Sequence, residues 1–158
     1  MNQCQHCREC CKFAADETYF GPLFTQDEIK GLDKSLFKQY KNSKNVFQIQ
    51  LVKSKKEDCY VCPLLDEASH LCTIYEKRPF DCKIWPFLFM RDKNNEPVLA
   101  CFDKELCGIF NSMVDAEFNK ELQKMNNKTT IEFLKKHKEL IWDFEEDTFI
   151  IKRISELN

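Results

Sequence analysis

Apolar and polar residues alternate in one stretch of the chain, and this pattern predicts a β-strand. In residues 46–52, Phe47, Ile49 and Leu51 alternate with two glutamines, so we expect a strand with one buried face. Two further segments have the composition of short strands, the first entered through an Asp-Lys-Asn-Asn turn at 92–95. These candidate strands are 97–102 and 148–154.

Apolar residues at helical spacing dominate the last third of the chain. Residues 113–125 carry them at intervals of three and four, which predicts a helix. Asn126-Asn127-Lys128 interrupts this helix, and Thr129 with Glu132 has the spacing of a capping box that begins a second one. The apolar face of this second helix is expected to include Ile131, Leu134, Ile141 and Trp142.

A capping box also stands nearer the N-terminus, after a turn at Gly21-Pro22. Thr25 is the expected N-cap and Glu28 the partner of a short helix that ends near Gly31, with a further helical turn at 35–40. Together these patterns predict an α+β fold, in which a small irregular core with short strands precedes C-terminal helices.

Length and composition are those of a single domain covering 1–158. The chain has 158 residues, 43% of them hydrophobic and 14 of them Phe, which is enough for a core without disulfides. Within this domain we distinguish a cysteine-rich region at 1–110 and a mainly helical extension at 111–158.

Several features bear on location and partners. No apolar run approaches the roughly 20 residues of a membrane helix, and the start Met-Asn-Gln-Cys has no features of a signal peptide. We therefore expect a cytoplasmic protein with no membrane partner. The formal net charge of -2 indicates no basic surface for nucleic acid, so the expected partners are a metal ion and possibly a protein.

Ten cysteines carry the candidate chemistry. Four of them fall in the first eleven residues as C-x2-C-x2-C-C. In a reducing compartment, thiols this close together are expected to ligate metal, because thiolates are soft anionic ligands for zinc and iron–sulfur clusters. The ten are Cys4, Cys7, Cys10, Cys11, Cys59, Cys62, Cys72, Cys82, Cys101 and Cys107.

Adjacent side chains of an extended or turning backbone are expected to point apart. Cys10 and Cys11 are therefore expected to serve different metals, or one of them none. Zinc sites usually contain paired C-x-x-C knuckles. The single, widely spaced cysteines at 72, 82 and 101, together with Cys62-Pro63, favour iron–sulfur clusters here, with zinc as the alternative.

Four motifs carry a family resemblance. C-x2-C-x2-C-C at 4–11, C-P-L-L at 62–65, C-T-I-Y-E-K-R-P-x2-C at 72–82 and Trp85-Pro86 resemble the CxxCxxCC cysteine-cluster family, also called YkgJ-like and described as zinc- or iron-chelating. The resemblance covers roughly 4–107 and treats Cys59 as an addition. It implies an eight-cysteine metal set, with Cys107 as the alternative eighth ligand: Cys4, Cys7, Cys10, Cys11, Cys62, Cys72, Cys82 and Cys101.

The resemblance implies a metal-binding module as the function. An iron–sulfur-dependent enzyme that modifies a protein side chain is the alternative, because some flagellin lysine methylases resemble this family. The chain has no recognisable S-adenosylmethionine motif, so whether it is an enzyme stays open, as does a metal-handling scaffold without turnover.

The residues around the cysteines allow two interpretations. Arg78 either neutralises the charge of the metal site or holds an anionic substrate, or else it pairs with a local carboxylate while Pro79 shapes the turn before Cys82. His6 and His70 are either ligands or loop histidines. The aromatic residues within 85–89 are expected to pack over the metal site or to form a partner surface.

Overall fold

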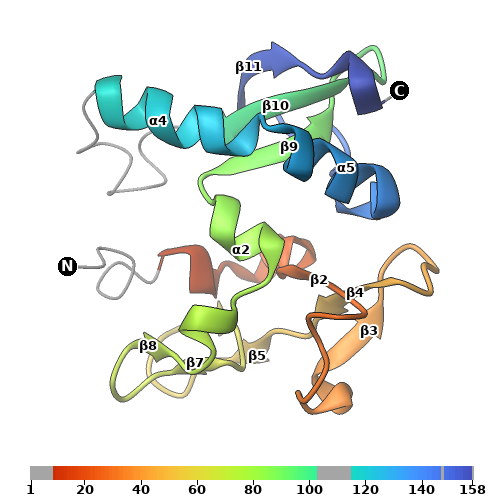
Figure 1. Ribbon diagram of the computed structural model, residues 1–158. Coiled ribbons are helices and arrows are strands. Elements are labelled where there is room, and N and C mark those ends of the chain that lie inside the picture. Colours follow the sequence, from red (N-terminus) through yellow and green to blue (C-terminus); the bar gives the residue numbers. More distant parts are fainter. Residues whose placement is uncertain (1–8, 103–114, 147, 158) are drawn as a thin grey trace. The chain divides into compact units, whose positions relative to one another are not determined.

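A computed structural model describes residues 9–102, 115–146 and 148–157 of the chain (Figure 1). The chain forms two compact units, Met1–Lys83 and Ile84–Asn158. Short antiparallel strands occur in both units, and helices follow in the C-terminal part, so the predicted α+β class is confirmed. That the whole chain is one domain stays a prediction.

Short strands build the first unit. They form a three-stranded sheet of order β2-β4-β3, a second of order β1-β6-β5, and the pair β7-β8. Their bounds are β1 Lys12–Phe13, β2 Leu23–Thr25, β3 Phe37–Gln39, β4 Val46–Ile49, β5 Val52–Lys53, β6 Tyr60–Val61, β7 Leu65–Asp66 and β8 Leu71–Cys72. Short 3-10 helices connect them: η1 Glu9–Cys11, η2 Ala15–Phe20, η3 Lys34–Leu36 and η4 Tyr75–Lys77.

The strand predicted at 46–52 is present only over Val46–Ile49, as β4, and its burial does not follow the expected alternation, because Phe47 is only partly buried. As the central strand of its sheet, β4 has neighbours on both sides. Gln48, expected on the exposed face, is only 4% exposed. Its Nε2 donates to the carbonyl oxygens of Tyr19 at 2.6 Å and Gly21 at 2.9 Å. These bonds offset the cost of removing the amide from water.

The first capping box is confirmed, whereas the helix expected after it is absent. The Thr25 N–H donates to Glu28 Oε2 at 2.8 Å, and the Glu28 N–H donates to Thr25 Oγ1 at 3.4 Å. Residues 26–32 then form a series of turns that includes Gly31 at φ 82°. The expected helical turn at 35–40 is replaced by η3 followed by strand β3.

The second unit contains a sheet of order β11-β10-β9, and both predicted strands belong to it. The strands are β9 Phe87–Arg91, β10 Pro97–Phe102 and β11 Thr148–Arg153. Every residue of the central strand β10 is buried. The predicted turn at 92–95 is confirmed, because Asp92 Oδ1 accepts the N–H groups of Asn94 at 2.8 Å and Glu96 at 2.9 Å.

Among its described residues, this unit also contains two helices and two 3-10 helices: α4 Asp115–Met125, α5 Lys128–Lys136, η6 Lys138–Leu140 and η7 Ser155–Leu157. The predicted break between α4 and α5 is confirmed. The second capping box is wrong: Asn127 caps α5, and its Oδ1 accepts the Thr130 N–H at 2.9 Å, which leaves Thr129 inside the helix.

The predicted apolar face of α5 is confirmed only in part. Ile131 and Leu134 are buried on α5, whereas Ile141 and Trp142 lie beyond its end. Trp142 instead forms a parallel β-bridge with Met90. Across the described ranges, 9–102 and from 115 onwards, the structure contains no helix with the length and apolarity needed to cross a membrane.

Candidate metal centre

A pocket in the first unit is lined by cysteines from four separate segments. Cys10 and Cys11 belong to η1, and Cys62 directly follows β6. Cys72 ends β8, and Cys82 lies in the short helix α2, Phe80–Ile84. The pocket encloses about 590 Å³ of empty space, part of it open to solvent. Residues distant in sequence therefore bring five thiols to one place.

Backbone hydrogen bonds hold two of these segments side by side. The Cys62 N–H donates to the Cys11 carbonyl at 3.0 Å, next to the β1–β6 pairing. The turn after Cys62 closes when the Leu65 N–H donates to the Cys62 carbonyl at 2.9 Å. Leu65 then pairs with Cys72 across the β7–β8 ladder. This chain of contacts connects Cys11, Cys62 and Cys72 through the backbone.

Two carboxylates anchor the helix that carries Cys82. Glu28 Oε1 accepts a hydrogen bond at 2.7 Å from the N–H of Phe80, the first residue of α2. Oε2 of Glu28 accepts the Thr25 N–H. Asp81 Oδ2 accepts the Leu23 N–H at 3.0 Å. Helix α2 is thus connected twice to the segment that contains β2. The sequence does not reveal either contact, although the capping box marks Glu28 as a residue that bonds to the backbone.

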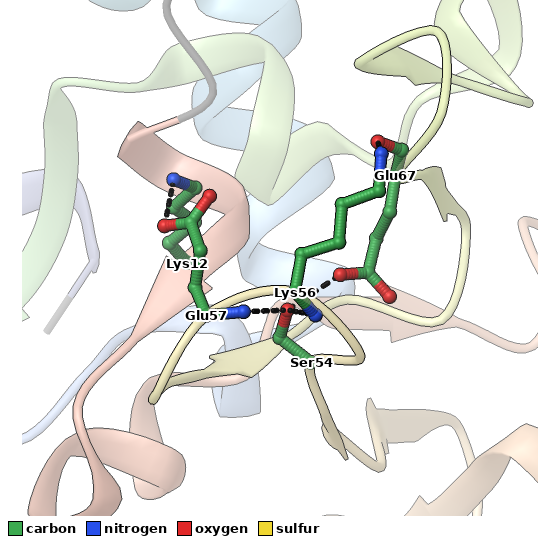
Figure 2. Close-up of polar contacts among 5 residues, drawn as sticks. All are labelled: Lys12, Ser54, Lys56, Glu57 and Glu67. Carbon is green, nitrogen blue, oxygen red and sulfur yellow. Dashed lines mark hydrogen bonds and ion pairs between the residues drawn. The ribbon is translucent and has the colours of Figure 1, made fainter.

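Hydrogen bonds and an ion pair connect the charged loop at 53–58 to two segments next to the cysteines (Figure 2). Ser54 Oγ donates to the Glu67 carboxylate, and Lys56 Nζ donates to the Glu67 carbonyl. Lys12, which directly follows Cys11, forms an ion pair with Glu57. The loop therefore connects the turn between β7 and β8 with strand β1, rather than being an independent solvated segment.

Burial raises the pKa values of three of the pocket thiols, those of Cys62, Cys72 and Cys82. It raises the pKa of the Cys62 thiol to about 12 and is also the largest cause of the raised pKa values of Cys72 and Cys82. The pKa of Cys10 is raised chiefly by its hydrogen bond with Cys11, and then by burial. Because a metal cation stabilises thiolates, its binding would reverse these shifts and release protons.

Arg78 brings a positive charge to the same pocket. Its Nε donates to the Tyr75 carbonyl at 2.9 Å, and its Cζ lies 3.7 Å from the centroid of the Tyr75 ring. The guanidinium charge acts to lower the pKa values of Cys10 and Cys72, against the larger effects that raise them. In the parts of the chain that the structure describes, no carboxylate forms an ion pair with Arg78.

Only some of the predicted ligands line this pocket. Cys10 and Cys11 line the same pocket, so the expectation that their side chains point apart does not hold in the tight 3-10 turn. Cys59 is not among the residues that line the pocket. Cys101 is buried in strand β10 of the second unit, where it pairs with Phe87 and Phe149. The remaining expected positions lie outside the described residues: Cys4, Cys7, Cys107 and His6.

The other candidate side chains fall in different places. His70 lines the pocket, with its backbone at φ 64°. His137 follows α5 and is partly exposed; its Nδ1 is buried and has no hydrogen-bond partner among the described residues. Phe87 and Phe89 are buried in β9 within the second unit, which excludes the exposed partner surface that was considered for them.

The donor chemistry of the pocket fits a soft metal, because five thiols line it along with mainly apolar side chains. Within the described part of the chain, however, no three His, Cys, Asp or Glu side chains are close enough together to hold a metal ion.

Comparison with known proteins bears on this site. A family model described as "CxxCxxCC: Putative zinc- or iron-chelating domain" matches residues 3–113. No curated protein and no solved structure matches the chain significantly. The matched range includes every cysteine of the pocket, and the family description supports metal binding by this domain. The chain belongs to the CxxCxxCC family of zinc- or iron-chelating domains.

Proposed function

We propose that this protein binds metal through the thiolates of the cysteine pocket. The observation that carries the proposal is that η1, the turn after β6, the end of β8 and helix α2 all contribute cysteines to one pocket. Cys4 and Cys7 belong to the same motif as Cys10 and Cys11, and they are the proposed further donors that complete the ligand set. Cys101 is proposed as the eighth ligand and Cys107 as its alternative.

We further propose iron–sulfur clusters as the bound species, with zinc as the alternative. Single cysteines from separate segments support this choice, since zinc sites more often combine two C-x-x-C knuckles. An iron–sulfur cluster would supply redox or Lewis-acid chemistry, while the protein residues supply thiolates and a pocket with few polar groups.

Anaerobic purification of the full chain tests both proposals. We expect a brown protein with broad visible absorbance that contains iron and acid-labile sulfide. A colourless protein with stoichiometric zinc would replace the cluster proposal with zinc binding. A folded protein that contains neither metal after purification, and takes up neither on reconstitution, would contradict metal binding altogether.

A second candidate function is that of an iron–sulfur-dependent enzyme acting on a protein side chain. One observation favours it: Tyr75 and Arg78 line the same pocket as the thiols, where a substrate would approach the metal. Such an enzyme needs a coordination position that an added ligand can occupy. Cyanide titration of the loaded protein is therefore expected to change its absorption spectrum, whereas a closed structural site would leave the spectrum unchanged.

The cytoplasm is the proposed location, and a protein partner stays a prediction. The close cysteine spacing supports this location, because it is typical of metal ligation in a reducing compartment. Cell fractionation tests the location directly. Recovery of the protein outside the cytoplasm, with its cysteines in disulfides, would contradict it.

A further inference from the structure

A metal site made of thiolates presents an electrostatic problem in this pocket. Four thiolates around a divalent ion leave a net charge of about -2. The pocket is lined mainly by apolar side chains such as Phe24, Leu64 and Ile74. A net charge is costly to bury in such surroundings unless an opposite charge lies beside it.

Arg78 is the only Lys or Arg among the residues that line the pocket in the described part of the chain. The neighbouring cations are directed elsewhere. Lys12 is engaged with Glu57, and Lys77 and Lys83 are exposed. Of the described basic residues near the cysteine motifs, Arg78 is thus the one placed to compensate charge inside the pocket.

Tyr75 fixes the orientation of this guanidinium. The Tyr75 carbonyl accepts from Nε, and the ring lies against the guanidinium plane with Cζ 3.7 Å from the ring centroid. Such stacking suits the planar guanidinium, whereas a lysine ammonium has neither the plane nor the Nε donor. No residue within the described ranges accepts a hydrogen bond from the two terminal nitrogens of Arg78, which leaves them available to sulfur.

We propose that Arg78, held by Tyr75, is the fixed counter-charge that lets this pocket accept a metal–thiolate complex of net negative charge. The inference rests on the proposed metal-binding function and assigns Arg78 a positioning and electrostatic role rather than a ligand role. It also accounts for the absence of a carboxylate partner among the described residues, since the partner of Arg78 would be the metal–thiolate complex itself.

Affinity for Zn²⁺, measured on the full chain by competition with a chromophoric chelator, tests the proposal. We expect R78Q to weaken binding about tenfold, because a nearby unit charge at low dielectric has an effect of at least this size. K77Q is the matched control: it removes one positive charge from the adjacent exposed position and is expected to leave the affinity unchanged. R78K should fall between R78Q and the wild type.

Two further measurements separate this role from a purely structural one. The thermal midpoint of the metal-free protein is expected to be similar in R78Q and K77Q, since the counter-charge acts only on the loaded site. Should R78Q fail to fold, Tyr75 provides the second test. Y75F keeps the ring and the carbonyl and should bind Zn²⁺ like the wild type, whereas Y75L should bind it more weakly.

Each result has a defined meaning. Equal Zn²⁺ affinities of R78Q and K77Q, or of Y75F and Y75L, would overturn the counter-charge role while leaving metal binding intact. An affinity loss in R78Q matched by an equal loss of stability in its metal-free form would overturn it as well. A wild-type chain that binds no metal would remove the proposed function and this inference together.

Discussion

Glu28 shows how one side chain can serve two distant parts of the chain. One oxygen accepts from Thr25 within its own turn, and the other accepts from Phe80, which is 52 residues away in sequence. The capping-box spacing predicts the first contact, because it depends only on residues three positions apart. The second depends on where α2 lies, and no local pattern encodes it.

Removal of this carboxylate should destabilise the first unit. We expect Glu28→Ala to lower the free energy of unfolding by about 1–3 kcal/mol, because it leaves the N–H groups of Thr25 and Phe80 without their acceptor. Urea denaturation measures the change. Asp27→Ala, at an exposed ion pair one residue away, should cost much less. Equal midpoints for the two variants would argue against the anchoring role of Glu28.

A comparison of two cysteines tests which thiols bind the metal. Cys72 lines the pocket, whereas Cys59 does not, although both are only partly buried. We expect Cys72→Ala to lose bound metal and Cys59→Ala to retain it, as measured by elemental analysis of the purified full chain. Full metal content in Cys72→Ala would show that the proposed ligand set is wrong.

Among elements, the β9–β10 hairpin was more predictable than the helix starts. Local composition predicts the turn at 92–95 and a strand at 97–102, and the structure contains both at these positions. The helix predicted after Thr25 is instead a series of turns. A capping box only favours the start of a helix. Here the turns reach Gly31, whose φ of 82° is incompatible with a continuing helix.

Two substitutions at the start of α5 compare the predicted cap, Thr129, with the observed cap, Asn127. Asn127→Ala should destabilise the protein by about 1 kcal/mol, because Oδ1 of Asn127 satisfies the Thr130 N–H. Thr129→Ala should be neutral or slightly stabilising, since Thr129 lies inside the helix, where alanine is the better helix former. Thermal unfolding compares them. A larger loss for Thr129→Ala would restore the cap position predicted from sequence.

The β9–β10 turn should make stability depend on acidic pH. Hydrogen bonds, first that from the Glu96 N–H, lower the pKa of Asp92. A lowered pKa in the folded state stabilises the protein at pH values above the unfolded pKa of about 3.9, and this contribution is lost as the pH falls through the folded pKa. Urea midpoints measured below pH 5 should therefore fall less steeply in Asp92→Asn than in the wild type. Parallel curves would contradict this contribution.

At the scale of the whole molecule, the metal pocket belongs to the core of only one unit. Cys62 and Leu64 line the pocket and also pack in a buried cluster with Phe24, Phe37 and Ile49. The second unit has its own buried residues, most of them on β9 and β10. Metal binding should therefore be coupled to the stability of the first unit in particular.

Metal removal tests this coupling. On chelation of the loaded protein, we expect hydrogen exchange to quicken at the amides of β6, β7 and β8, whose backbone bonds connect the cysteine segments. Helix α5 of the second unit, which carries none of the proposed ligands, should retain its protection. Uniform loss of protection in both units would mean that the metal stabilises the chain as a whole.

The sequence by itself determined the family and several local elements, and it predicted thiolates as the metal ligands. Cysteine spacing, the C-x-I-Y-x-x-R-P motif, hydrophobic alternation and turn residues all act over a few positions, so they can be interpreted without a fold. Only the tertiary structure decided that Cys10, Cys11, Cys62, Cys72 and Cys82 share one pocket, and that Arg78 faces it without a described carboxylate partner. Those facts depend on contacts between segments that lie ten to seventy residues apart, and such contacts arise from packing and long-range hydrogen bonds rather than from local pattern.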